Sequence, residues 1–158
     1  MMNIIKISED FAKKEYAKHD EFHQWHHVED VMNMALKLAE FHPKADLEIL
    51  KLAVIFHDIS YEKYETHVEE SMNVAEKFLR EQNYPEDKIK KILQVMISHS
   101  GPHRRKLGEA KMIEGKIIYD SDKFHLAKTK EGFEKYFNRF YLDETRDMIK
   151  KSCPEFFD

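Results

Sequence analysis

Residues 47–58 read LEILKLAVIFHD. Apolar residues recur in this segment at intervals of three and four positions, the period of one face of an α-helix, and they are Leu47, Leu50 and Val54. His57 continues the same face, and Asp58 follows it directly. Because so apolar a face is expected to be buried, the segment predicts a core helix with two ionisable residues at its C-terminal end.

The same helical period continues on both sides of this segment. The apolar stripes cover residues 28–39, 72–79, 89–99, 118–126 and 133–141. Asp46 can cap the helix that starts at residue 47, and Pro85 with Glu86 and Asp87 is typical of a first helical turn. No run of alternating β-branched residues is present. The sequence therefore predicts an all-α protein with six or seven helices in one bundle-like domain over residues 1–158. The stretch around Gly115 is the weakest part, because glycine inside a helix costs about 1 kcal/mol relative to alanine.

Composition indicates a globular protein that binds a small molecule. The hydrophobic fraction is 42%, which is typical of a chain with one packed core. The formal net charge of −4 is spread along the sequence without a basic tail or a like-charge block. Binding to a nucleic acid polymer and anchoring by a polybasic segment are therefore not expected.

Three further features predict a cytoplasmic location. The longest purely apolar run, residues 52–56, is far shorter than the roughly 20 residues of a membrane-spanning helix. The N-terminal segment carries Lys6, Glu9, Asp10, Lys13 and Lys14 and lacks the apolar region of a secretory leader. Cys153 is the single cysteine, so no disulfide can form within the chain.

Ionisable residues interrupt the apolar stripes at several points. Asp122 lies one turn after Ile118, and His27 precedes the first stripe. A buried carboxylate is costly unless a cation neutralises it or its pKa rises. A single histidine on an apolar face is usually an ordinary hydrogen-bonded core residue. His27, the pair His57 and Asp58, and Asp122 form a more specific set, because together they could hold one divalent ion such as Mn, Fe, Co, Ni or Zn.

This ordered set resembles the HD superfamily of metal-dependent phosphohydrolases, whose signature is His, then His-Asp, then a distal Asp. The segments that carry the resemblance are residues 22–28 (FHQWHHV), 53–59 (AVIFHDI) and 117–124 (IIYDSDKF). Residues 67–71 (HVEES) and 97–100 (ISHS) are similar to small stand-alone members of the superfamily. The resemblance implies a helical fold and a site for one divalent ion (Mn, Co, Ni, Fe, Mg or Zn), held by His27, His57, Asp58 and Asp122.

Two of these positions have competing candidates. His23, His26 and His27 compete for the first one, and the aliphatic Val28 that follows favours His27. Asp120 and Asp122 compete for the last one, where the following Lys-Phe favours Asp122. Asp120 would then have a supporting or structural role.

The resemblance also implies roles for residues around the ion. Glu62 has the place of an acidic residue that activates or positions the attacking water, although a solvated loop glutamate fits the pattern equally well. His67 and His99 are assigned to substrate contacts, with a second ion as the alternative. Phosphate also needs cations, and the candidates are Lys63, Lys123 and Arg104 with its neighbour Arg105. The loop of residues 101–105 could equally be an ordinary solvated basic turn.

The function expected from this pattern is hydrolysis of a small phosphorylated metabolite, with a nucleotide as the favoured class. A bound ion would polarise a phosphoryl oxygen and lower the pKa of a bound water. The alternatives are a di-iron oxygenase on the same scaffold, which requires His67 or His99 as a ligand, and a non-catalytic module that binds metal or nucleotide. We expect the aromatic stripe of residues 133–141 to form core or a homodimer surface rather than a platform for base stacking.

Overall fold

The computed structural model describes residues 3–21 and 24–158 and contains only helices and the segments that connect them within those ranges. The α-helices are α1 (Ile4–Tyr16), α2 (Trp25–Ala39), α3 (Leu47–Phe56), α4 (His67–Glu81), α5 (Glu86–Ser98), α6 (Gly101–Leu107), α7 (Ile113–Lys123), α8 (Lys130–Tyr136) and α9 (Asp143–Ser152). Three short 3₁₀ helices follow α7, α8 and α9, and they are η1 (Leu126–Lys128), η2 (Phe137–Arg139) and η3 (Pro154–Phe157). The all-α prediction is confirmed.

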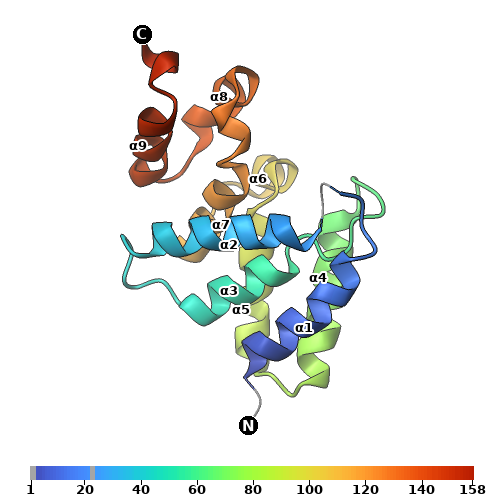
Figure 1. Ribbon diagram of the computed structural model, residues 1–158. Helices are drawn as coiled ribbons and strands as arrows, with labels where there is room; N and C mark the ends of the chain where they lie inside the picture. The colour runs from blue at the N-terminus through green and yellow to red at the C-terminus, as the bar shows by residue number, and fades with distance from the viewer. Residues whose placement is uncertain (1–2, 22–23) are drawn as a thin grey trace.

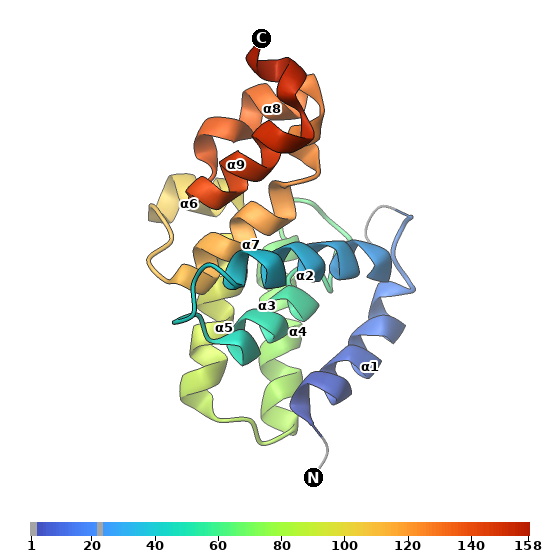
Figure 2. The same ribbon diagram turned by 60° about the vertical axis from the view of Figure 1, so that its left-hand side comes forward.

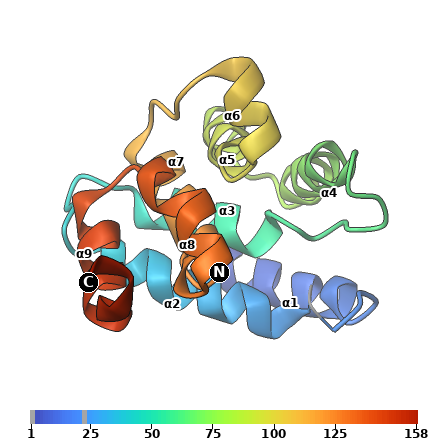
Figure 3. The same cartoon turned by 90° about the horizontal axis from the view of Figure 1, so that it is seen from above.

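Helix α3 lies at the centre of the molecule. It packs against α1, α2, α4, α5 and α7, and Figure 3 shows it between the α1–α2 pair and the α4–α5 pair. Its residues from Leu50 to Phe56, apart from Lys51, are fully buried. A helix that is apolar on nearly all sides must be enclosed by other elements, so the other helices are arranged around α3. The predicted cap is present, since Asp46 accepts a hydrogen bond from the backbone N–H of Ile49 at 3.2 Å.

The described residues form nine α-helices, more than the six or seven expected, because α1, α6 and α9 lie outside the apolar stripes on which that expectation is based. Helices α8 and α9 lie together at the end of the molecule opposite the N-terminus (Figures 1 and 2). Gly115 lies inside α7, and a larger residue would not fit there, because an added Cβ would lie only 2.7 Å from Ser98 Oγ of α5. The missing side chain therefore lets α7 approach α5 closely. No helix of the described chain is long and apolar enough to cross a membrane.

The single last helix expected over residues 133–141 is wrong in its extent. Helix α8 ends at Tyr136, η2 follows, and Phe140 has an extended backbone. The reason lies in α7, where the buried Asp120 accepts hydrogen bonds from the backbone N–H groups of Tyr141 at 2.9 Å and Leu142 at 3.0 Å. These bonds hold the chain in an extended form just before α9 begins.

Helix α1 fixes the end of α3 through one side chain. The Tyr16 hydroxyl is fully buried, donates to the carbonyl of Ile55 at 2.9 Å and accepts from the backbone N–H of Asp58 at 3.2 Å. It therefore satisfies two backbone groups at a helix end, where they lack helical partners.

We expect Tyr16→Phe to lower the free energy of unfolding by about 1–3 kcal/mol, because it leaves a buried N–H and a buried carbonyl without a partner. Tyr84→Phe is the matched control. The Tyr84 hydroxyl donates to Glu48 at the surface, where water can replace it, and the loss should be about 0.5 kcal/mol or less. Urea unfolding of both variants measures the difference, and equal losses would contradict the bridging role of Tyr16.

Candidate metal centre

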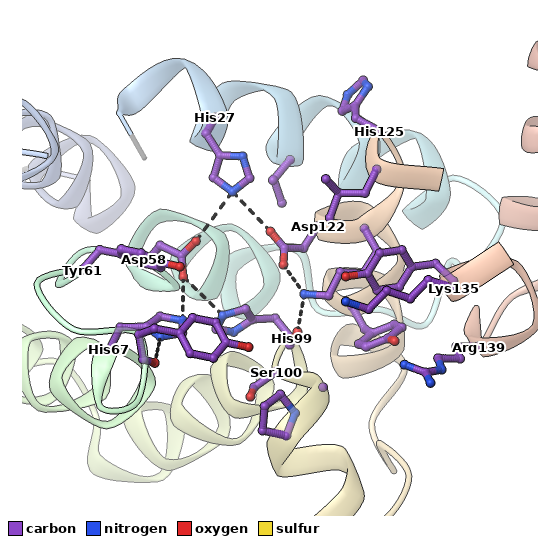
Figure 4. A pocket seen from close by; sticks show the side chains of 18 of the residues that line it. His27, Asp58, Tyr61, His67, His99, Ser100, Asp122, His125, Lys135 and Arg139 are labelled. Carbon is purple, nitrogen blue, oxygen red and sulfur yellow. Dashed lines mark hydrogen bonds and ion pairs between the residues drawn. The ribbon is translucent and has the colours of Figure 1, made fainter. Parts of the chain in front are cut away.

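Four side chains converge beside the C-terminal end of α3; two come from α2 and α7, and two from the residues that directly follow α3. Their ligand atoms all lie within 4.8 Å of one another, and we call this group the first cluster: His27, His57, Asp58 and Asp122. His57 Nε2 is 3.3 Å from Asp58 Oδ2 and 3.4 Å from Asp122 Oδ1. His27 Nε2 is 3.2 Å from the same Asp122 oxygen (Figure 4). The structure therefore brings together the four residues that the sequence singled out.

A second cluster shares one residue with the first. It consists of Asp58, His67 and His99. Asp58 Oδ1 lies 3.3 Å from His99 Nε2 and 3.5 Å from His67 Nε2 (Figure 4). Asp58 thus turns one carboxylate oxygen toward each cluster.

Hydrogen bonds to the backbone set which nitrogen of each ring faces the carboxylates. The Nδ1–H groups of His57 and His67 donate to the carbonyls of Val54 and Tyr64, both at 2.6 Å. His99 Nδ1 donates in the same way to Met96. A carbonyl can only accept, so Nδ1 carries the hydrogen and the neutral ring presents the lone pair of Nε2.

These lone pairs and the carboxylate oxygens are all acceptors, so their close approach requires positive charge. Asp58 Oδ1 is buried and has no hydrogen-bond partner in the part of the chain that the structure describes. Imidazole nitrogen and carboxylate oxygen are common ligands of divalent transition metals. Both clusters therefore fit a divalent cation.

The pKa values of the first cluster also indicate that positive charge is favoured at this site. Burial lowers the pKa of His57 and His27, but Asp58 and Asp122 outweigh it and raise these values to about 10 and about 9. Burial raises the pKa of each carboxyl, yet the imidazoles, with Lys123 beside Asp122, hold both well below their usual range. The carboxylates are thus ionised at neutral pH, and each Nε2 takes up either a proton or a metal ion.

The structure separates the two candidate aspartates of α7. Asp122 faces the first cluster, where Lys123 Nζ holds its Oδ2 at 2.5 Å and also donates to the carbonyl of His99 at 2.8 Å. Asp120 is fully buried elsewhere and accepts from the start of α9, including the Thr145 hydroxyl at 2.6 Å. Burial raises the pKa of Asp120 to about 6 despite these hydrogen bonds. Asp120 therefore organises the fold rather than the metal centre.

The clusters open into a cavity of about 460 Å³. His67, His99 and Lys123, expected to contact substrate, line it together with three members of the first cluster, His27, Asp58 and Asp122. Of the other two candidates for the first position, His26 is exposed and does not line the cavity, and His23 lies outside the described residues.

The structure does not bring Glu62, Lys63 or Arg104 to this cavity. Glu62 and Lys63 are exposed on the segment between α3 and α4. Arg104 pairs with Glu109 at 2.6 Å and lies 4.0 Å over the ring of Tyr141, where it lines a separate pocket. The helical period explains this difference, because residues 101–107 form α6 instead of the turn that we expected. Gly101 and Arg105 then share the face toward the cavity, and Arg104 lies on another.

Sequence reasoning missed most of the cavity rim. Arg105, named only beside Arg104, lines the cavity with Lys135, Tyr136 and Arg139. The last three come from the aromatic stripe that we assigned to core or a dimer surface. The spacing of Lys135 and Arg139, four residues apart, was the available signal for a shared face.

Comparison with known proteins gives a family and a fold. The family model of the HD domain matches residues 25–127, more than half of the chain. No curated protein matches the chain.

Solved structures of three proteins are similar in fold. A predicted HD superfamily hydrolase from an uncultured Thermotogales bacterium has 19% identity and a TM-score of 0.69, over 99% of this chain and 93% of that one. YpgQ of Bacillus subtilis has 18% identity and a TM-score of 0.71, over 95% of this chain and 89% of that one. The structure of YpgQ in complex with ADP has 14% identity and a TM-score of 0.68, over 97% of this chain and 89% of that one. A Lactobacillus plantarum protein has 20% identity and a TM-score of 0.65, over 80% of this chain, which spans only 58% of that protein.

The two aspartates of α7 provide a matched test of the metal assignment. Asp122→Asn should weaken Mn²⁺ binding by more than the roughly 10–100-fold that loss of a supporting residue costs. Asp120→Asn should leave Mn²⁺ binding intact but lower the free energy of unfolding by about 1–3 kcal/mol, because the start of α9 loses hydrogen bonds. Calorimetric titration and urea unfolding measure the two effects. If Asp120→Asn abolished binding and Asp122→Asn did not, the assignment would be reversed.

Mn²⁺ binding should strengthen as the pH rises. The raised pKa values of His57 and His27, about 10 and about 9, mean that metal must displace protons below these values. In chelator-treated protein the same protons stabilise the fold fully below the ordinary pKa of about 6.5, and this stabilisation is lost as the pH rises through 9 to 10. We expect a higher Mn²⁺ affinity at pH 8.5 than at pH 6.5 in calorimetric titrations. An affinity that does not change with pH would contradict proton displacement.

Proposed function

Since the chain belongs to the HD domain family, we propose that it is a metal-dependent phosphohydrolase acting on a small phosphorylated metabolite, with a nucleotide as the favoured substrate class. The first cluster would hold the essential divalent ion. When bound, such an ion supplies positive charge that polarises a phosphoryl oxygen and lowers the pKa of water.

The distribution of charge in the cavity is the observation that carries this proposal. Its floor consists of carboxylates and imidazole acceptors, which suit a cation. Its rim carries Arg105, Lys135 and Arg139, which suit an anion. A phosphate group can contact both a divalent cation and this cationic rim, because its oxygens accept hydrogen bonds from arginine and also bind metal.

Aromatic side chains support a nucleotide as the substrate. Tyr61, Tyr64 and Tyr136 line the cavity together with the exposed Leu126. Flat apolar side chains beside a phosphate site can accommodate a base. The ADP complex of YpgQ is consistent with a ligand of this class for a protein of the same fold.

The chain's own residues have distinct roles in this proposal. Lys123 orients the carboxylate of Asp122, since its Nζ donates both to Asp122 Oδ2 and to the carbonyl of His99. His67 and His99 would contact substrate or hold a second ion beside Asp58. No role is assigned to Lys63 or Arg104. A cytoplasmic location and a homodimer stay predictions.

We also propose that residues 1–158 form one HD domain, beyond the matched residues 25–127. Tyr16 contacts the backbone of Asp58 from the N-terminal side. Asp120 binds the start of α9 on the C-terminal side. Segments outside the matched region thus support the centre of the domain.

A di-iron oxygenase is the second candidate, and the second cluster is the observation that favours it. Asp58 could bridge two ions because its oxygens face different clusters. Two irons per chain with a visible charge-transfer band, and no phosphate release, would favour this alternative.

We expect phosphate or pyrophosphate release from one or more nucleotides in a screen of mono-, di- and triphosphates with Mn, Co, Ni, Fe, Mg and Zn. Asp58→Ala should remove both bound metal and activity, because the substitution takes a ligand and a charge from both clusters. Glu65→Gln, an exposed residue outside the cavity, is the control and should retain both. Full activity in Asp58→Ala would contradict the proposal, whereas Glu62→Gln in the same assay tests the water-positioning role expected from the sequence.

A further inference from the structure

A chain of three polar side chains leads from the cavity wall to the protein surface. Ser100 lines the cavity beside His99 and is 6% exposed (Figure 4). Its Oγ lies 2.7 Å from His103 Nδ1, and His103 Nε2 lies 2.7 Å from Glu69 Oε1. The side chain of His103 is 17% exposed and that of Glu69 is 57% exposed. The three residues come from α4, the start of α6 and α6 itself, so they meet only in the folded chain.

Glu69, the surface residue of this series, determines which atoms donate and which accept in the two hydrogen bonds. Glu69 is an exposed glutamate and hence a carboxylate at neutral pH, so its Oε1 accepts the hydrogen bond from His103 Nε2. His103 Nε2 consequently carries a hydrogen. Nδ1 accepts from the Ser100 hydroxyl when the ring is neutral and donates to Ser100 Oγ when the ring is protonated. In the protonated state the hydroxyl hydrogen of Ser100 is available to an acceptor in the cavity.

Other groups at the cavity floor are already engaged. His57, His67 and His99 each use Nδ1–H for a backbone carbonyl and turn Nε2 toward Asp58. The Lys123 ammonium contacts Asp122 and the carbonyl of His99. Ser100 differs from all of these because its hydroxyl connects through an imidazole to a surface carboxylate.

We propose that Ser100 is a catalytic residue that protonates the leaving oxygen of the substrate, with His103 as the proton source and Glu69 as its positioning residue. This assignment rests on the proposed phosphohydrolase function. Water attacks phosphorus and forms the new P–O bond, while the electrons of the breaking P–O bond stay on the leaving oxygen. That oxygen takes the Ser100 proton, and Ser100 takes the Nδ1 proton of His103. The attacking water releases one proton to solvent, and His103 regains one from solvent.

A purely structural role for Ser100 makes a different prediction. Ser100 is the N-cap of α6, and its Oγ also accepts from the backbone N–H of His103 at 3.4 Å. Loss of a cap costs stability, typically about 1 kcal/mol, irrespective of the substrate that is hydrolysed. Proton delivery instead matters most when the leaving group is a strong base and little when it is a weak base.

The test uses Mn²⁺-loaded protein and two esters with the same phosphoryl group, phenyl phosphate and p-nitrophenyl phosphate. Ser100→Ala should lower kcat for phenyl phosphate by about 10²–10⁴-fold and have a much smaller effect on the nitrophenyl ester, with KM little changed. His103→Gln should show the same selectivity, and Glu69→Gln a weaker form of it. Ser100→Thr, which keeps the hydroxyl, should restore most of the rate with phenyl phosphate.

Several outcomes would overturn the relay. Equal losses with the two esters would assign Ser100 to capping alone, and unchanged rates would remove it from the reaction. If the wild-type protein hydrolysed neither ester and no nucleoside monophosphate, but released phosphate from nucleoside di- and triphosphates or pyrophosphate from triphosphates, the leaving group would be a phosphate that needs no proton. The relay would then be wrong while the proposed phosphohydrolase function stood. If no phosphorylated compound were hydrolysed, both would fail.

Discussion

The burial of Asp58 is the constraint on which the rest of this structure depends. An ionised carboxylate in a protein core is stable only if positive charge and hydrogen-bond donors surround it. Here its backbone N–H is held by Tyr16 from α1, and its two oxygens face imidazoles from α2, α3, α4 and α5. Every one of these helices packs against α3 or starts beside its end. The contacts that pack the helices around α3 therefore also bring the side chains of the metal centre together.

Two helix ends orient the histidines that face Asp58. His57 and His99 cap the C-terminal ends of α3 and α5, where backbone carbonyls lack helical partners. In each case Nδ1–H donates to a carbonyl three residues earlier, at Val54 and Met96. One hydrogen bond satisfies the carbonyl and selects the ring tautomer that offers Nε2 to Asp58. Supporting hydrogen bonds of this kind orient metal-binding histidines in proteins generally.

The sequence predicts the fold class and the four members of the first cluster because they lie on or next to strongly periodic apolar helices. It predicts the outer parts of the site poorly. Arg104 and Arg105 are adjacent and chemically alike, and only the phase of α6 decides that Arg105 faces the cavity. The aromatic stripe breaks at Phe140 because of Asp120, about 20 residues earlier in the chain, and local periodicity does not contain that contact. Glu62 lies in an irregular segment whose path depends on packing at both ends.

We propose that a divalent ion is held between His27, His57, Asp58 and Asp122. Anomalous diffraction from crystals grown with Mn²⁺ tests this claim most directly. We predict a strong anomalous peak bounded by those four side chains, with any second peak between Asp58, His67 and His99. A well-ordered structure with these side chains in place and no peak among them, or with manganese only at surface carboxylates, would contradict the account.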